Sequence, residues 1–352
     1  MEKSYLKGRG AQVKTANKFL EQQYVREFDE GLDEELIPEK ISTQIFYESP
    51  QKVVNKVDSP DVGMDYSLNA YQGCEHGCVY CYARTTHEYW GFSAGLDFET
   101  KIVVKKNAPE LLERHLLQKG WLAKPIVLSG NTDCYQPLEQ KLKITRRLLE
   151  VFAKYRHPVG IITKNATVTR DIDILKDLAK DQLVKVILSI TTLDDKLRAR
   201  MEPRTSSVNK KLEAIEKLSQ AGIPVGIMNA PLVPGLNHHE IPEVIKAAAE
   251  CGASSAGYTV VRLNGAIEEI FKDWLQKNYP DKFNKVCHLI EELHDGKTSD
   301  STFGRRMKGE GEISNIIKQL FDSATKKYMS GRSTPALNTY SFRKGGNYTL
   351  FN

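Results

Sequence analysis

The sequence predicts an α/β fold in which helices cover a largely parallel β-sheet. Six short apolar runs indicate buried strands, at residues 66–70, 125–129, 159–163, 183–190, 223–228 and 256–263. Each run is followed by a segment with helical spacing of apolar residues. Continuous apolar strands are typical of a sheet that is covered on both faces. An open doubly wound sheet and a complete or partial barrel all fit this pattern, and in each of them ligands bind at the carboxyl ends of the strands.

The intervening helices can be placed by periodicity and by their ends. Apolar residues step by three and four from Leu138 to Phe152, which predicts one helix over 138–152. Thr169 is expected to cap the next helix. Gly222 and Gly252 are expected to end two later helices, because glycine favours the left-handed position after a helix.

Composition places the chain among ordinary globular proteins. Its 352 residues are 40% apolar and 27% charged, which argues against a disordered tail protein. No apolar run approaches the ~18 residues of a membrane span, so no membrane partner is expected. Residues 1–7 lack the apolar core of a signal peptide, which predicts a cytoplasmic location and few disulfides.

The chain divides into three predicted parts. Residues 1–62 show no sustained periodicity and are expected to form an N-terminal arm, and residues 63–297 hold the strand–helix units. Residues 298–352 form a basic C-terminal extension with nine basic and four acidic side chains. Aromatic residues are interleaved with this charge, a composition that suits a nucleic-acid surface, and Arg305, Arg306 and Lys308 are the candidate phosphate contacts. A solvated basic face is the alternative.

Three cysteines mark the candidate site. Cys74, Cys78 and Cys81 lie within eight residues, directly after the first predicted strand, and this clustering points to a metal. Structural zinc sites usually have four protein ligands, which here would require His76 or His87 as the fourth. An exposed reactive cysteine loop is a further alternative.

An iron–sulfur cluster fits the three thiols better. Each cysteine can bind one iron of a four-iron cube, which leaves the fourth iron without a protein ligand. Gly73 and Gly77 would let the backbone wrap closely around such a bulky group, because neither has a β-carbon.

The spacing Cys-x3-Cys-x2-Cys, with Tyr80 before the third cysteine, resembles the signature of the radical S-adenosylmethionine (SAM) superfamily. The segment from Cys78 to Tyr82, together with residues 132–139, is similar to the DNA repair photolyase-like branch, which includes spore photoproduct lyase. The resemblance covers roughly residues 67–263.

The resemblance implies a partial (β/α)6 barrel of the TIM type with a [4Fe-4S] cluster at its mouth. It further implies that SAM binds the open iron and is reductively cleaved, giving a 5′-deoxyadenosyl radical that abstracts hydrogen from the substrate. A reducing partner such as flavodoxin or ferredoxin would supply the electron. Nucleic acid is the leading substrate class.

The same resemblance implies a set of SAM-binding residues. Thr132 and Asp133 are expected at the amino group, and Lys164 at the carboxylate. Ser189 and Thr191 are expected at the ribose or carboxylate, Arg204 at the carboxylate, Asn229 at the adenine, and Tyr80 over the cluster or adenine. Helix capping and turn formation are the alternatives for the Thr, Ser and Asp side chains.

Tyr82 and Cys134 are the candidate catalytic residues. Tyr82 resembles a tyrosine that relays a radical in spore photoproduct lyase, with a packed tyrosine as the alternative. The hydrogen-donor cysteine of that enzyme precedes the aspartate by three residues, and Gly130 stands there in this chain. Cys134 follows the aspartate instead and is expected either to quench a substrate radical or to be a small buried thiol.

A second function class fits the same residues. A non-catalytic iron–sulfur protein could bind nucleic acid and sense redox state through its cluster. The enzyme and the sensor differ in whether SAM is cleaved.

Overall fold

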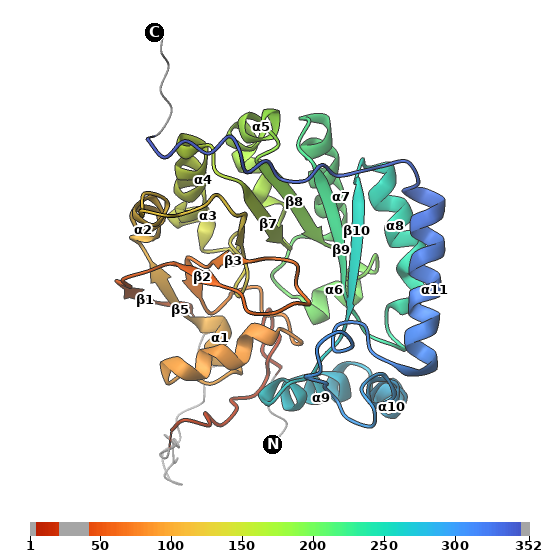
Figure 1. Cartoon of the computed structure of the whole chain (residues 1–352). Coiled ribbons are helices and arrows are strands. Elements are labelled where there is room, and N and C mark those ends of the chain that lie inside the picture. The colour runs from red at the N-terminus through yellow and green to blue at the C-terminus, as the bar shows by residue number, and fades with distance from the viewer. Residues whose placement is uncertain (1–4, 21–41, 346–352) are drawn as a thin grey trace.

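The computed structural model describes residues 5–20 and 42–345, and Figure 1 shows their arrangement. Its main sheet has seven strands in the order β10-β9-β8-β7-β6-β3-β2. The six predicted strands are confirmed, and they lie in chain order with parallel pairing throughout. They are β3 (Tyr66–Leu68), β6 (Ile126–Leu128), β7 (Val159–Thr163), β8 (Val184–Ser189), β9 (Val225–Leu232) and β10 (Ser255–Val260).

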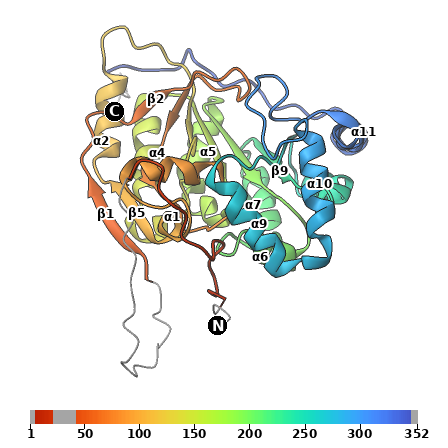
Figure 2. The same cartoon turned by 90° about the horizontal axis from the view of Figure 1, so that it is seen from below.

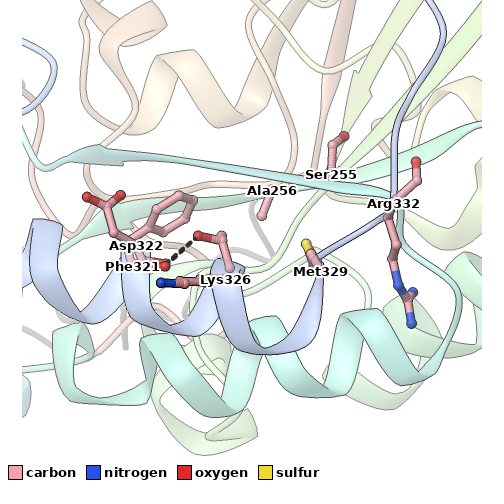
Figure 3. Close-up of a pocket in the computed structure, with 9 residues that line it drawn as sticks. Ser255, Ala256, Phe321, Asp322, Lys326, Met329 and Arg332 are labelled. Atoms are coloured by element: carbon pink, nitrogen blue, oxygen red, sulfur yellow. Dashed lines mark hydrogen bonds between the residues drawn. The ribbon is translucent and has the colours of Figure 1, made fainter.

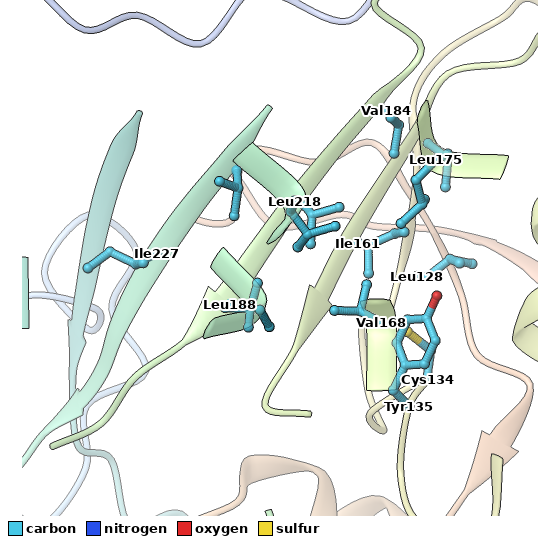
Figure 4. Close-up of a cluster of buried hydrophobic side chains, with 14 of the residues drawn as sticks. Leu128, Cys134, Tyr135, Ile161, Val168, Leu175, Val184, Leu188, Leu218 and Ile227 are labelled. Atoms are coloured by element: carbon cyan, nitrogen blue, oxygen red, sulfur yellow. The ribbon is translucent and has the colours of Figure 1, made fainter. Parts of the chain in front are cut away.

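The sheet is open, because β10 lies at one edge and β2 (Val54–Lys56) pairs antiparallel with β3 at the other. This is the expected α/β partial barrel. The helices that cover it include α2 (Ala108–Leu116), α4 (Ile144–Tyr155), α5 (Ile172–Lys180), α7 (Val208–Gln220) and α8 (Ile241–Glu250). Figure 4 shows side chains of β7, β8 and β9 meeting Leu175 and Leu218 from these helices. This packing forms the main core.

Two local predictions were wrong. The helix expected over 138–152 is broken at Lys143, which adopts a left-handed backbone (φ 52°), so α3 (Glu139–Leu142) and α4 are separate. The break has a cause, because the Glu139 carboxylate accepts the backbone N–H groups of Ile144 and Thr145 at 3.0 and 3.1 Å and so caps α4. Thr169 does not cap α5 but lies inside the 3-10 helix η2 (Ala166–Asp171).

A smaller sheet, in the order β1-β5-β4, stands beside the main one. It consists of β1 (Gln44–Glu48), β5 (Lys101–Lys105) and β4 (Tyr71–Gln72). Strands β1 and β2 come from the first 62 residues, where the sequence shows no periodicity. The 3-10 helix η1 (Tyr82–Trp90) and α1 (Leu96–Thr100) connect β4 to β5. The boundaries at 62 and 297 stay a prediction.

The chain after β10 packs against the barrel. It forms α9 (Ala266–Asn278), η4 (Pro280–Lys282), α10 (Phe283–Leu293) and α11 (Gly311–Tyr328), while the short η3 (His238–Glu240) and α6 (Asp195–Met201) lie earlier. Helix α11 lies against α8, and residues 329–345 then run back across the sheet (Figure 1). Asn338 N–H bonds Gln182 O, and Arg343 N–H bonds Tyr155 O, both at 2.9 Å. Since these partners precede β8 and β7, the segment crosses the amino ends of the strands.

An open depression of about 510 Å³ also lies toward these amino ends, between α11 and the start of β10 (Figure 3). Ser255, Phe321 and Lys326 are among the residues that line it. The depression therefore lies at the amino ends of the strands, whereas the fold class predicts ligands at their carboxyl ends. Within the described ranges no helix is both long and apolar enough to cross a bilayer.

Candidate functional site

The loop that carries the three cysteines lies at the carboxyl ends of the parallel strands. It begins after β4, and Cys81 is the residue before η1. His76 contacts Asp133 and Asn165, which follow β6 and β7, at 3.4 and 3.2 Å. The Tyr80 hydroxyl lies 3.4 Å from the hydroxyl of Thr191, which is two residues after β8. The loop therefore contacts the exits of three neighbouring strands.

The backbone on each side of Cys74 is held by a single side chain. Gln136 is fully buried, and its Oε1 accepts Glu75 N–H at 3.0 Å while its Nε2 donates to Gly73 O at 3.2 Å. Gly73 and Gly77 have φ angles of 80° and 68°, so the loop uses the left-handed turns that only glycine adopts without strain. Sequence reasoning did not find Gln136 as a site residue.

A buried ion pair supports the other half of the loop. Arg84 and Glu99 are both fully buried and lie 2.6 Å apart, and Arg84 Nε also donates to Cys78 O at 2.8 Å. Glu99 in turn accepts the N–H groups of Gly10 and Ala11 at 3.1 and 2.7 Å. A β-carbon on Gly10 would lie 1.8 Å from the carbonyl oxygen of Gly77. Residues 9–11 are thus packed directly onto the cysteine loop.

The three cysteines are free thiols of the kind that bind metals. Cys74 and Cys78 are buried, and burial raises the pKa of each of the three. A bound metal ion favours the thiolate and would offset this cost. In the part of the chain described, no three His, Cys, Asp or Glu side chains converge as they would around a single ion. An iron–sulfur cube does not need such convergence, because each thiolate binds its own iron, so this donor set fits the cube.

Beside Cys78 lies a buried carboxylate that sequence reasoning missed. Glu202 is fully buried, accepts the hydroxyl groups of Tyr80 and Thr191, and lies 3.2 Å from the ammonium groups of both Lys164 and Lys211. Burial alone would raise the pKa of Glu202, but the two ammonium groups outweigh it and hold the pKa below its usual range. Only the fold shows that Glu202 is the counter-charge, because Lys164 follows β7 and Lys211 lies in α7.

Two lysines share the Glu202 carboxylate. Burial lowers the pKa of Lys211, whereas at Lys164 the attraction of Glu202 and neighbouring groups outweighs burial and raises the pKa. Lys164 also donates to Ala230 O at 3.2 Å and lies 5.6 Å from the centre of the Tyr80 ring. The ammonium group of Lys164 suits an anionic group such as a carboxylate.

The side chains of Asp133 and Thr132 are hydrogen-bonded to other residues of the protein. Asp133 accepts Thr163 Oγ1–H and Lys164 N–H, each at 2.7 Å, in addition to its contact with His76. Burial raises the pKa of Asp133, but His76 and these bonds outweigh it and hold the pKa below its usual value. Thr132 Oγ1 donates to Tyr71 O at 2.7 Å. Both side chains therefore fix the loop and the strand exits.

The structure brings the other expected cofactor residues to the same end of the sheet. Ser189 is the last residue of β8, and Arg204 lies 3.4 Å from Glu75, the residue after Cys74. Asn229 was expected after the fifth strand but lies inside β9, which continues to Leu232. Asn229 Nδ2 donates to Ile190 O at 2.7 Å, while its Oδ1 is buried with no hydrogen-bond partner among the residues described.

The two candidate catalytic residues lie in different surroundings. Tyr82 is 56% exposed, and its hydroxyl donates to Gly130 O at 2.7 Å, so it lies at the rim beside the β6 exit. Cys134 is buried in the main core with Leu128, Tyr135 and Val168 (Figure 4). Its position favours the packing role that the sequence left open.

The basic residues expected to contact phosphates form ion pairs and hydrogen bonds with other residues of the chain. Arg305 pairs with Asp300 and Glu310, and Arg306 pairs with Asp61. Lys308 donates to Tyr258 O at 2.8 Å and lies over the ring of that tyrosine. Each of the three side chains therefore has partners within the chain, and its role as a phosphate contact stays a prediction.

Comparison with known proteins identifies the family. A family model described as the radical SAM superfamily matches residues 68–248, which include the cysteine loop and the four parallel strands from β6 to β9. The chain belongs to the radical SAM superfamily. It is therefore a radical SAM enzyme. Membership of this superfamily implies that SAM and an iron–sulfur cluster are its cofactors.

Curated relatives match between half and about two thirds of this radical SAM chain. It is 30% identical over 242 residues to an uncharacterised protein of Mycobacterium tuberculosis, covering 68% of this chain and 71% of that protein. It is 29% identical over 239 residues to an uncharacterised protein of Methanocaldococcus jannaschii, covering 68% and 85%. A radical SAM Nα-GlyT isomerase of Pseudomonas phage M6 is 26% identical over 180 residues, covering 51% of this chain and 35% of the isomerase.

Solved structures share the fold. Spore photoproduct lyase complexed with a dinucleoside spore photoproduct has a TM-score of 0.59 and 17% identity, over 82% of this chain and 80% of that one. A mutant of the same lyase with bound SAM and the dinucleoside photoproduct gives a TM-score of 0.59 and 17% identity, over 82% and 79%. At this identity the likeness shows the fold alone, and it confirms the partial barrel.

The charge cluster around Glu202 predicts the effect of two substitutions. Glu202→Gln should lower the free energy of unfolding by about 3–5 kcal/mol, because it leaves two buried ammonium groups without a counter-charge. Lys211→Met should cost less, because Glu202 and Lys164 then form a neutral pair. Urea denaturation of both variants checks the order, and an equal or smaller loss for Glu202→Gln would contradict this description of the cluster.

Proposed function

We propose that Cys74, Cys78 and Cys81 hold a [4Fe-4S] cluster and that the enzyme reductively cleaves SAM to abstract hydrogen from a nucleic-acid substrate. The observation that carries the proposal is the position of the cysteine loop. The loop that carries the three thiols contacts the exits of β6, β7 and β8, beside the Lys164 ammonium group. When bound, the cluster and SAM together supply an electron and a 5′-deoxyadenosyl radical for hydrogen abstraction.

The residues around the loop have distinct proposed roles. Lys164 binds the SAM carboxylate, with Arg204 as the second cation and Ser189 or Thr191 as hydroxyl partners. Asn229 lies on the adenine side, where its unpaired buried Oδ1 could accept an amine hydrogen.

The remaining two expectations concern the SAM amino group and the cluster itself. We propose that Thr132 and Asp133 hold the loop in the position where it meets the SAM amino group. Tyr80 is proposed to shield the cluster. Support for Tyr80 comes from its place between Cys78 and Cys81 and its buried hydroxyl, which Glu202 holds.

The substrate class rests on the resemblance and on the neighbouring structures. Spore photoproduct lyase has been solved with a dinucleoside photoproduct, which supports a nucleic acid as the substrate class here. A reducing protein such as flavodoxin or ferredoxin is the proposed electron donor. A redox sensor that binds nucleic acid without cleaving SAM remains the alternative, and the next experiment separates the two.

Anaerobic reconstitution tests the proposed chemistry. The reduced protein should contain about four irons per chain and form 5′-deoxyadenosine from SAM. Cys78→Ala should lower both strongly, because one iron loses its ligand. Cys251→Ala is the matched control, since Cys251 is a half-buried thiol at the end of α8, and it should leave both unchanged. Intact SAM with tight, salt-dependent oligonucleotide binding would contradict the enzyme and support the sensor.

Cys134 can be tested separately as a hydrogen donor. If it quenches a substrate radical, Cys134→Ala should change the ratio of products to by-products while SAM cleavage continues. Because the thiol is packed in the core, we expect unchanged product ratios and a loss of stability of about 1 kcal/mol. Chromatography of the products measures the ratio, and an altered ratio would return Cys134 to the mechanism.

A further inference from the structure

Glu202 contacts three of the residues expected to bind SAM. Its carboxylate accepts the hydroxyl groups of Tyr80 and Thr191 and lies 3.2 Å from the ammonium group of Lys164. These partners belong to the cysteine loop and to the segments that follow β8 and β7. Glu202 itself follows α6, which lies on the side of the carboxyl ends that Figure 2 views. One buried carboxylate therefore joins side chains from three separate parts of the candidate site.

The two oxygen atoms of the Glu202 carboxylate have different partners. Oε1 receives all three of these contacts. Oε2 instead lies 3.2 Å from the ammonium group of Lys211 and 3.3 Å from the hydroxyl group of Thr205. Neither Lys211 nor Thr205 is among the residues expected to bind SAM. One oxygen of the carboxylate thus faces the expected cofactor residues, and the other faces residues that support it.

Lys211 is placed to hold the carboxylate in this orientation. It lies near the start of α7, and its side chain is 1% exposed. Among the described residues, Glu202 is its ion-pair partner. A charge-assisted hydrogen bond between two buried groups is strong, and no water is at hand to replace either partner. Turning the carboxylate would break this bond, so Lys211 resists rotation of Glu202 from the side opposite the expected SAM residues.

The backbone of Glu202 is fixed as well. Arg198 donates from Nη1 to the carbonyl oxygens of Glu202 and Thr205, each at 3.2 Å. Two residues after Glu202, the N–H group of Arg204 bonds the carbonyl oxygen of His76 in the cysteine loop at 3.3 Å. Glu202 therefore has supports that are independent of the side chains at Oε1. Since its own place does not depend on those side chains, it can determine theirs.

We propose that Glu202 is a positioning residue for SAM binding and that Lys211 holds Glu202 in place from the side away from the cofactor. The proposal rests on the SAM site proposed above and assigns two further residues to it. Glu202 acts through Lys164, Tyr80 and Thr191, whose polar groups it holds before SAM binds. A binding group that is already ordered loses less conformational entropy when its ligand binds, so the affinity is higher.

The affinity of the anaerobically reconstituted full chain for SAM tests the proposal. SAM is titrated into the reduced protein, and the change in the electron paramagnetic resonance signal of the cluster gives the dissociation constant. Lys211→Met should weaken SAM binding about 10-fold, the lower end of the range for loss of an orienting partner. Lys210→Met is the matched control, because it removes an exposed ammonium group from the same helix, and it should bind SAM like the unchanged protein.

The double variant Glu202→Met/Lys211→Met separates positioning from charge. It removes one negative and one positive group, so the net charge around Lys164 is that of the unchanged protein. Replacing a buried ion pair by apolar side chains of similar size is often tolerated, so this variant is expected to fold even where Glu202→Gln does not. Positioning by Glu202 predicts that the double variant binds SAM at least about 10-fold more weakly. An effect of charge alone predicts unchanged binding, and that result would overturn the proposal.

Iron content separates this proposal from the one on which it rests. Each variant should keep about four irons per chain, because its three thiols are unchanged. A variant that lost iron together with SAM affinity would show that Glu202 supports the whole loop, and the positioning role would be overturned. If SAM binds the unchanged protein and both variants equally well, the positioning role is wrong and the SAM chemistry stands. If the unchanged protein holds its iron and its signal does not respond to SAM, both proposals are overturned.

Discussion

The site depends on holding a short, cysteine-bearing loop at one fixed position over the carboxyl ends of the strands. Such a loop has few contacts of its own, and its peptide groups lose their water when they are buried. Unpaired buried polar groups cost about 1–3 kcal/mol each, so the loop is stable only where the protein supplies partners. Gln136 supplies them around Cys74, and the Arg84–Glu99 pair supplies them around Cys78. Both fully buried supports come from outside the loop.

The same supports place charge beside the thiols. Glu202 lies 3.2 Å from the ammonium groups of both Lys164 and Lys211, beside Cys78. A buried ammonium group is stable beside groups of opposite sign, and an anionic ligand would add one more. The geometry of the charged groups and the chemistry of the proposed cofactor thus meet at Lys164. The N-terminal segment adds a second layer, because residues 9–11 lie on the loop and their N–H groups bond Glu99.

Local signals carried most of what the sequence predicts. The six strands, the cysteine spacing and the left-handed glycines are properties of neighbouring residues, and the structure confirms the strands and the fold. Long-range pairs were not visible in the same way. Glu99 and Glu202 are ordinary carboxylates in the sequence, and only the fold brings them to Arg84 and to Lys164. The break at Lys143 was missed for a related reason, since Glu139 caps α4 from outside the helix. The internal partners of Arg305 and Arg306 were not predicted, because a basic composition does not reveal which residues form ion pairs.

The central claim is that three thiolates hold an iron–sulfur cube whose fourth iron is open to SAM. Electron paramagnetic resonance of the anaerobically reconstituted, reduced protein tests it most directly, with spectra recorded before and after SAM is added. The account predicts a reduced [4Fe-4S] signal whose shape changes on addition of SAM, because a ligand then binds the open iron. Protein that contains zinc in place of iron, or a cluster signal that SAM leaves unchanged, would contradict it.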